Sequence, residues 1–210
     1  MLEPLALMGG TFDPVHHGHL ITARAVAEQQ GYRRVVLVPA ATPPHKQAAP
    51  SSSDDRLAML RLAVEGDPLF EISTIELDRG GPSYTLDTLR RLRAVHGQAV
   101  PLHWIIGADM LEMLPTWHCA GELLETAQLV VAYRPPWTAG QLEQVFVRLA
   151  EQLPPPRVRE IRRHVAATPQ IEISSSDIRR RVADGRSIRN LVPPPVEQYI
   201  LDHVLYRPGG

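Results

Sequence analysis

The residues best suited to chemistry lie near the start of the chain, in the segment GGTFDPVHHGH at positions 9–19. Gly9 and Gly10 would let a phosphate approach the backbone without a Cβ in the way. A helix beginning near Gly18 would offer free N–H groups and a positive dipole end to an anion. His16 and His19 are three residues apart, so both imidazoles share one face if the helix starts by His16. The segment is therefore a candidate phosphate site flanked by two histidines.

A purely structural role and a metal site are the alternatives to phosphate binding in this segment. The segment matches neither the G-x-x-x-x-G-K-[ST] loop nor the G-x-G-x-x-G fingerprint. A lone histidine is more often a helix cap or a surface residue, although the pair is harder to account for in that way. A metal site is a minor alternative, because no H-E-x-x-H or cysteine pattern accompanies the candidate ligands Asp13, His16, His17 and His19.

A second candidate anion site is the segment ISSSDIR at positions 173–179. Three serines precede an apolar-periodic helix, so one of them is expected to be its N-cap. The remaining hydroxyls, the N-terminal amides and Arg179 could bind phosphate, which the planar guanidinium suits. We expect Arg180 and Arg181 to point to solvent.

Further candidate residues could equally well be structural when each is taken alone. Asp109 follows a buried strand and Gly107, where a carboxylate can accept hydrogen bonds from ribose, but it could also be a helix cap. Trp117 in LPTWH either packs in the core or stacks on a planar ring. Tyr84 and Thr85 open a helix, of which Thr85 could be only the cap.

The elements that must position these residues alternate between short apolar runs and longer helical patterns. Strands are expected at 5–8, 34–38, 70–77, 102–106, 128–133 and 171–173, and helices at 19–29, 55–64, 85–95, 141–153, 174–183 and 196–203. This order predicts an α/β fold with a parallel sheet and crossover helices. Segments 9–19, 105–109 and 173–179 each follow a predicted strand, so they could line one crevice at the carboxyl edge of the sheet.

The connections add one functional hint. Residues 39–52, PAATPPHKQAAPSS, contain four prolines and form a loop longer than compact domains usually keep without a use for it. Ser51 and Ser52 resemble a capping box that opens the next helix. The proline runs at 154–156 and 193–195 are expected to be connectors. We expect one domain over residues 1–210, with 174–210 as a small C-terminal helical segment.

Composition limits the classes of function. The formal net charge is −1, so no overall field favours nucleic acid or an anionic membrane. Cys119 is the only cysteine, which excludes an internal disulfide and a multi-cysteine zinc site. The N-terminal apolar run is too short for a signal peptide, and no run of about 18 apolar residues is present. A cytoplasmic protein without membrane or nucleic-acid partners is expected, and its oligomeric state is open.

The two candidate anion sites together resemble the motifs of the nucleotidyltransferase superfamily. GGTFDPVHHGH fits the pattern G-x-F-x-P-x-H-x-G-H, and ISSSDIR resembles I-S-S-T-x-I-R with Ser176 in place of threonine. The segments PPHK at 43–46, PSYT at 82–85, IIGAD at 105–109 and PTW at 115–117 are similar to those of bacterial nicotinate-nucleotide adenylyltransferases. The resemblance runs nearly end to end and implies a Rossmann-like parallel sheet with helices on both faces.

The resemblance also implies roles for individual residues. The catalytic residues would be His16, His19 and Arg179. ATP would be bound by Gly9, Gly10, Thr11, Phe12, Ile106, Gly107, Asp109, Ser175 and Ser176. Nicotinate mononucleotide would be bound by His45, Lys46, Tyr84, Thr85 and Trp117, with the tryptophan stacked on the pyridine ring. His118 stands where some relatives have tyrosine.

The implied reaction joins nicotinate mononucleotide to the AMP of ATP and releases pyrophosphate, with Mg²⁺ carried by the ATP phosphates rather than by protein ligands. No nucleophile and base suited to a covalent intermediate stand out, so direct in-line transfer is the simpler mechanism. The alternatives are a phosphopantetheine adenylyltransferase or a cytidylyltransferase, which share both motifs, and a non-catalytic nucleotide sensor. Trp117 and PSYT argue against the first two, and the histidines against the third.

Overall fold

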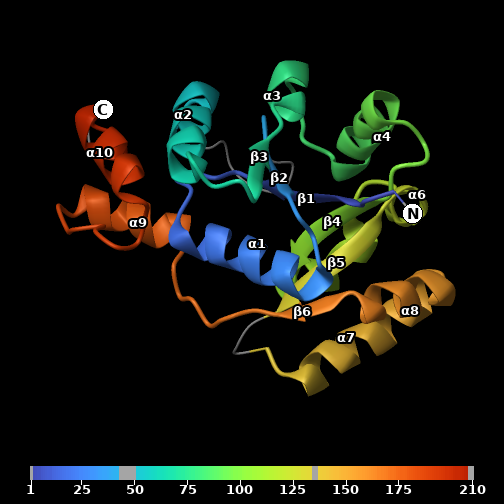
Figure 1. Ribbon diagram of the computed structural model, residues 1–210. Coiled ribbons are helices and arrows are strands. Elements are labelled where there is room, and N and C mark those ends of the chain that lie inside the picture. The colour runs from blue at the N-terminus through green and yellow to red at the C-terminus, as the bar shows by residue number, and fades with distance from the viewer. Residues whose placement is uncertain (1, 43–50, 134–136, 208–210) are drawn as a thin grey trace.

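The computed structural model describes residues 2–42, 51–133 and 137–207 (Figure 1). Its centre is a parallel sheet of six strands in the order β3-β2-β1-β4-β5-β6. The strands are β1 (Leu5–Gly10), β2 (Val35–Pro39), β3 (Phe70–Ile72), β4 (Leu102–Gly107), β5 (Gln128–Tyr133) and β6 (Val165–Ala167). The strand order reverses between β1 and β4, and in open sheets of this kind ligands bind beyond the carboxyl ends of the two strands at that point. The predicted fold class is confirmed.

Helices cover both faces of the sheet. One face packs against α4 (Thr85–His96), α5 (Ala108–Glu112), the 3₁₀ turn η1 (Leu114–Thr116), α6 (Ala120–Thr126), α7 (Ala139–Gln152) and α8 (Pro155–Arg163). The other packs against α1 (His17–Gln30), α2 (Ser53–Val64), α9 (Ser175–Ala183) and α10 (Pro194–Asp202). The short helix α3 (Ile75–Arg79) follows β3.

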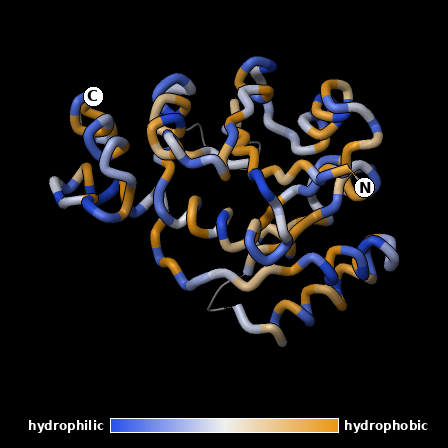
Figure 2. Tube along the Cα trace, viewed as in Figure 1, coloured by the Kyte–Doolittle hydropathy of each residue, from blue (hydrophilic) through white to orange (hydrophobic). Residues whose placement is uncertain are grey.

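The strands are apolar on both sides because each face is covered. In β2, Val36 and Val38 belong to the first cluster, whereas Val35 and Leu37 belong to the second. Such continuous apolar strands are typical of parallel sheets buried between helices. The helices instead expose one side to water, and Figure 2 shows orange and blue alternating along α7 and α8.

The C-terminal helices lie on the same side of the sheet as α1 and α2. Figure 1 shows α9 beside the N-terminal end of α1 and α10 beside α2. The Tyr199 hydroxyl of α10 donates a hydrogen bond of 3.0 Å to the Asp55 carboxylate of α2. The N–H of His17 donates to the carbonyl of Leu191, between α9 and α10. The last helices are therefore attached where α1 begins.

Four sequence predictions about elements were wrong. Residues 171–173 do not form a strand, and the sixth strand is β6, which pairs with β5 at the sheet edge and ends before Pro169. The proline run at 154–156 is not a connector, since Pro155 opens α8, where its missing N–H costs nothing. Pro194 opens α10 in the same way. The strand predicted over 70–77 stops at Ile72. Glu76 belongs to α3 instead, where it is buried and accepts a hydrogen bond from the Thr88 hydroxyl of α4.

No helix within the described ranges is long and apolar enough to cross a membrane.

At Gly9, near the end of β1, the neighbouring strand leaves no room for a side chain. A Cβ on Gly9 would lie 2.5 Å from Cζ2 of Trp104, a buried residue of β4. The ring cannot retreat easily, because protein interiors are close-packed. The space expected from the sequence to admit a phosphate is, on this side of the backbone, filled by an indole.

We therefore predict that Gly9→Ala lowers the free energy of unfolding by about 1–3 kcal/mol through overpacking. Gly140→Ala is the matched control, since a Cβ on that helical glycine would meet only Thr138 Oγ1, at 3.9 Å. The control should be neutral or stabilised by up to about 1 kcal/mol. Urea unfolding of the three proteins measures both effects, and an unchanged midpoint for Gly9→Ala would show that Trp104 moves aside.

Candidate active site

The turn after β1 is shaped by its own aromatic residue. Phe12 has a left-handed backbone with φ 51°, and its ring is buried. The ring lies against Gly10, where a Cβ would approach Phe12 Cζ to 3.0 Å. It also meets the His19 ring edge-on, with 5.1 Å between the centroids. Phe12 thus packs beneath the turn and supports one of the two candidate histidines.

The two histidines lie in contact at the start of α1. His16 is the N-cap residue and His19 belongs to the first turn of α1. Their rings stack with 3.7 Å between centroids and 25° between planes. The N–H of His16 donates to Nδ1 of His19 at 3.3 Å. Because Nδ1 of His19 accepts, the proton of the neutral ring lies on Nε2, which is the donor that a phosphate oxygen requires.

The C-terminal motif is hydrogen-bonded directly to this turn. The Ser175 hydroxyl donates to the carbonyl of Pro14 at 2.9 Å. Nη1 of Arg179 donates to the carbonyl of Asp13 at 2.7 Å. Ser174 is the N-cap expected among the three serines, and Ser176 accepts from Arg179 at 3.3 Å. The structure thus brings together two motifs from opposite ends of the chain.

The end of β4 supplies the third predicted segment. Ile106 is buried in the first core cluster, so only its backbone is available to a ligand. Gly107 is the N-cap of α5, and a Cβ there would overlap the Asp109 carboxylate. Asp109 itself is exposed and lies inside the helix, so it is not the helix cap.

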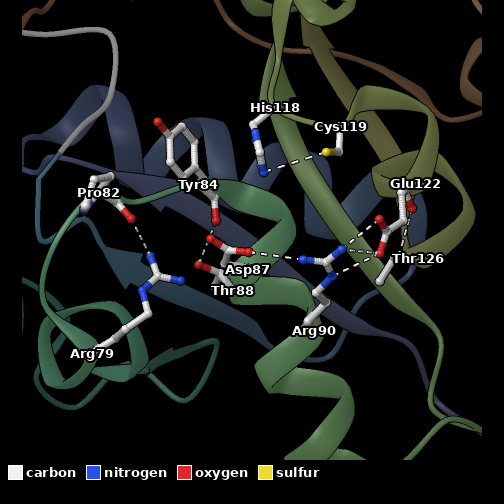
Figure 3. A network of polar contacts seen from close by, with 10 residues as sticks. All are labelled: Arg79, Pro82, Tyr84, Asp87, Thr88, Arg90, His118, Cys119, Glu122 and Thr126. Atoms are coloured by element: carbon white, nitrogen blue, oxygen red, sulfur yellow. Dashed lines mark hydrogen bonds and ion pairs between the residues drawn. The ribbon is translucent and has the colours of Figure 1, made fainter.

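Among the residues expected to bind the acceptor, Tyr84 and Thr85 lie at the start of α4 and Trp117 lies at the end of η1, on the same face of the sheet. Tyr84 is the N-cap of α4, so Thr85 is not merely the cap. The Tyr84 ring lies 4.7 Å from the ring of His118, next to Trp117 in the chain (Figure 3). Arg90 joins α4 to α6 through Glu122. The segments 82–85 and 115–117 are therefore neighbours, as a shared pocket requires.

Trp117 has the packing role, and its stacking role stays a prediction. The side chain is half-buried and packs against the first core cluster. Its indole nitrogen is buried and has no hydrogen-bond partner among the described residues. Packing fixes the ring in place, and the part that is not covered remains accessible to a planar ligand.

The residues expected to bind the acceptor, here called the acceptor side, are linked through the end of β2 to the turn after β1, which is expected to bind phosphate and is here called the phosphate turn. The N–H of Ala41 donates to the Ser83 hydroxyl at 2.9 Å, and the N–H of Ala40 donates to the carbonyl of Gly10 at 2.9 Å. Behind Ser83, the buried Glu76 accepts from Thr88 at 2.6 Å. Burial raises the pKa of Glu76 above its ordinary value, against the opposing effect of these hydroxyls.

His45 and Lys46, which were predicted to bind the acceptor nucleotide, lie outside the described residues.

Arg56 is a residue that sequence reasoning missed. It lies on α2, is 1% exposed, and donates to the carbonyls of Thr11 at 2.9 Å and Ala40 at 2.7 Å. Burial lowers the pKa of its guanidinium, an effect that the Asp13 carboxylate opposes. Helical spacing could have indicated its burial, because Arg56 lies three and four residues before Met59 and Leu60, on the buried face of α2.

Within the part of the chain that the structure describes, no group of three or more His, Cys, Asp or Glu side chains could hold a metal ion. The Asp13 carboxylate, one of the alternative ligands, accepts hydrogen bonds from the Tyr206 hydroxyl and the Ser51 N–H instead.

The fold and the two joined phosphate motifs define a nucleotidyltransferase, and the model of the cytidylyltransferase-like family matches residues 7–181. A relative in Thermomicrobium roseum, named "Probable nicotinate-nucleotide adenylyltransferase", is 46% identical over 98% of this chain and 92% of its own. A relative of the same name in Pectobacterium atrosepticum is 42% identical over 96% of this chain and 98% of its own. The chain therefore belongs to the nicotinate-nucleotide adenylyltransferases, within the cytidylyltransferase-like family.

A solved structure shares the fold at lower identity. Nicotinic acid mononucleotide adenylyltransferase of Plasmodium falciparum, complexed with NaAD, superimposes with a TM-score of 0.75. Its identity is 15%, and the match covers 97% of each chain. This likeness extends over the whole sheet and both helical layers.

We predict that Arg56→Met lowers the free energy of unfolding by about 3 kcal/mol, because it leaves buried carbonyls of the turn and of β2 without a donor. Arg61→Met on the same helix is the control, since Arg61 is exposed and should change stability by less than about 0.5 kcal/mol. Urea denaturation at neutral pH compares them. Equal stability of the two variants would show that the Arg56 contacts do not hold the turn.

Proposed function

We propose that this protein transfers the AMP part of ATP to nicotinate mononucleotide, giving deamido-NAD and pyrophosphate in NAD biosynthesis. The observation that carries the proposal is the direct contact between the two motifs, in which Ser175 and Arg179 bind the turn that leads to His16. Relatives that bear this activity in their name match the chain over nearly its whole length, which supports the choice of acceptor.

ATP would lie across the carboxyl ends of β1 and β4. We assign its phosphates to His16, His19 and Arg179 and to the backbone of residues 9–12. Ser175 and Ser176 would add hydroxyls at the N-terminus of α9, where free amides and the helix dipole favour an anion. Ile106 and Gly107 would contact the nucleoside through the backbone, and the exposed Asp109 carboxylate is suited to accept from ribose hydroxyls.

The acceptor nucleotide would lie between α4 and η1. Trp117 would stack on the pyridine ring, and Tyr84 and Thr85 at the start of α4 would hold the nicotinate carboxylate. The first-turn N–H groups of α4 favour this negative charge. His45 and Lys46 would reach the phosphate of the acceptor. The bond from Ala41 to Ser83 supports this arrangement, since it places residues just before the 43–50 segment beside the acceptor side.

The reaction would be a direct in-line displacement. A phosphate oxygen of the acceptor attacks the α-phosphorus of ATP, and the bond from that phosphorus to the bridging oxygen breaks with pyrophosphate as the leaving group. The attacking oxygen is already anionic and needs no base, so alignment and charge stabilisation supply the catalysis. Mg²⁺ would enter bound to ATP, as part of the substrate, and neutralise phosphate charge.

One pair of side chains offers a covalent alternative that was not expected from the sequence. Cys119 Sγ lies 3.6 Å from His118 Nε2, a thiol and an imidazole in contact. The pair is exposed beside Tyr84, on the acceptor side rather than at the phosphate turn. It is therefore poorly placed for the α-phosphorus of ATP, and direct transfer stays the preferred mechanism.

We also propose that residues 1–210 act as one domain, with 174–210 as its C-terminal helical segment. The hydrogen bonds from α9 to the turn after β1 support this, because the phosphate site then draws on both ends of the chain.

Measurement of pyrophosphate release tests the function directly. With ATP and Mg²⁺, nicotinate mononucleotide should give rapid release, and nicotinamide mononucleotide at least about tenfold less, because an anion gains more from the donors around Thr85 than an amide does. Phosphopantetheine should give none. Release with phosphopantetheine alone would keep the superfamily chemistry and overturn the assigned acceptor.

Replacing one histidine tests the site. His19→Ala should lower kcat by about 100-fold or more, as loss of a transition-state donor does elsewhere, and should leave the unfolding midpoint nearly unchanged. His17→Ala is the control from the same turn and should stay within about threefold of the wild type. A comparable loss in both variants would favour the metal alternative, and an unchanged kcat in His19→Ala would remove that residue from the mechanism.

A further inference from the structure

The last described helix is followed by a segment that returns to the phosphate turn. The Tyr206 hydroxyl donates a hydrogen bond of 2.6 Å to Oδ1 of Asp13, 193 residues away in the chain. Asp13 is 1% exposed, so its carboxylate must find partners within the protein. The second oxygen accepts from the N–H of Ser51 at 3.4 Å. Burial and the negative charge of Asp13 raise the pKa of Tyr206 above its ordinary value.

Asp13 is also the residue at which the two phosphate motifs meet. Its carbonyl accepts the bond from Arg179, and its side chain accepts the bond from Tyr206. It stands between Phe12, whose backbone is left-handed, and the residues that lead to His16. A left-handed conformation in a bulky residue persists only where its surroundings fix it. The bonds to Asp13 are part of those surroundings.

The return of the chain to Asp13 has its own conformational cost. Val204 and Tyr206 both have a positive φ, of 53° and 63°. The N–H of Leu205 donates to the carbonyl of Ile200, which closes the turn after α10. Neither residue is a glycine, so this conformation is unfavourable in itself and needs a compensating contact. The buried bond between Tyr206 and Asp13 is such a contact.

We infer that Tyr206 is a positioning residue for adenylyl transfer: through Asp13 it fixes the turn that orients His16 and Arg179 toward the phosphates. The inference rests on the proposed function. Tyr206 reaches none of the described residues that we assign to the acceptor, since Tyr84, Thr85 and Trp117 lie around α4 and η1. Its loss should therefore lower the rate of transfer while leaving acceptor binding intact.

The test compares two tyrosines of the same segment. Tyr206→Phe keeps the ring and removes the hydroxyl, and it should lower kcat by about tenfold or more with less than about a twofold change in the KM of nicotinate mononucleotide. Tyr199→Phe is the matched control, because that hydroxyl also donates to an aspartate, Asp55, at 3.0 Å. The control should keep kcat within about twofold. Wild-type kcat in Tyr206→Phe, or a loss confined to KM, would overturn the inference.

A double-mutant cycle shows whether Tyr206 acts through Asp13. If it does, adding Tyr206→Phe to Asp13→Asn should lower kcat much less than it does in the wild type. Full multiplication of the two losses would overturn the inference, since the residues would then act separately.

Hydrogen exchange gives a readout that does not depend on the reaction. Amides in residues 11–19 should exchange at least about tenfold faster in Tyr206→Phe than in wild type and Tyr199→Phe, with the central strands unchanged. No change in residues 11–19 would contradict the positioning role. If the wild type itself releases no pyrophosphate with nicotinate mononucleotide, the proposed function fails, and exchange still decides whether Tyr206 holds the turn.

Discussion

The hydrogen bonds from α9 to the turn after β1 are the constraint on which the site depends. Loop carbonyls that lie away from water need donors. In this protein the donors for Asp13 and Pro14 come from Arg179 and Ser175, more than 160 positions later. Arg56, on α2, likewise donates a hydrogen bond to the carbonyl of Thr11. The phosphate turn is thus held by parts of the chain that become neighbours only in the completed sheet.

The site is formed by residues from the helical layers on both faces of the sheet. One face of the sheet is covered by α1, α2, α9 and α10, beside the turn after β1. The other face is covered by α4 to α6, which carry the described residues that we propose to bind the acceptor. The two sides meet beyond the carboxyl ends of β1, β2 and β4, where Ala40 binds Gly10 and Ala41 binds Ser83. A reaction between two nucleotides suits a site of this kind, because each partner can be bound by a different helical layer and meet the other at the strand ends.

The parallel sheet could be predicted from the sequence, since apolar strands and helical periods are local signals. The pairing of His16 with His19 could also be predicted, because it follows from helix geometry. Prediction from the sequence failed for features that depend on tertiary contacts. Residues 171–173 look like a strand but have no neighbour to pair with, and Arg56 and Tyr206 act through contacts that local patterns do not reveal. The predicted phosphate-binding role of Gly9 stays a prediction, and it is Trp104 that limits the space at its Cβ.

We propose that this site transfers AMP directly, without a nucleotidyl-enzyme intermediate on His16, His19 or Cys119. The most direct test uses ATP that is chiral at the α-phosphorus through a sulfur substituent, with nicotinate mononucleotide as acceptor. A single in-line displacement inverts the configuration at phosphorus, so the account predicts inversion in the dinucleotide product. Retention would mean two successive displacements and a covalent intermediate, and it would contradict the account.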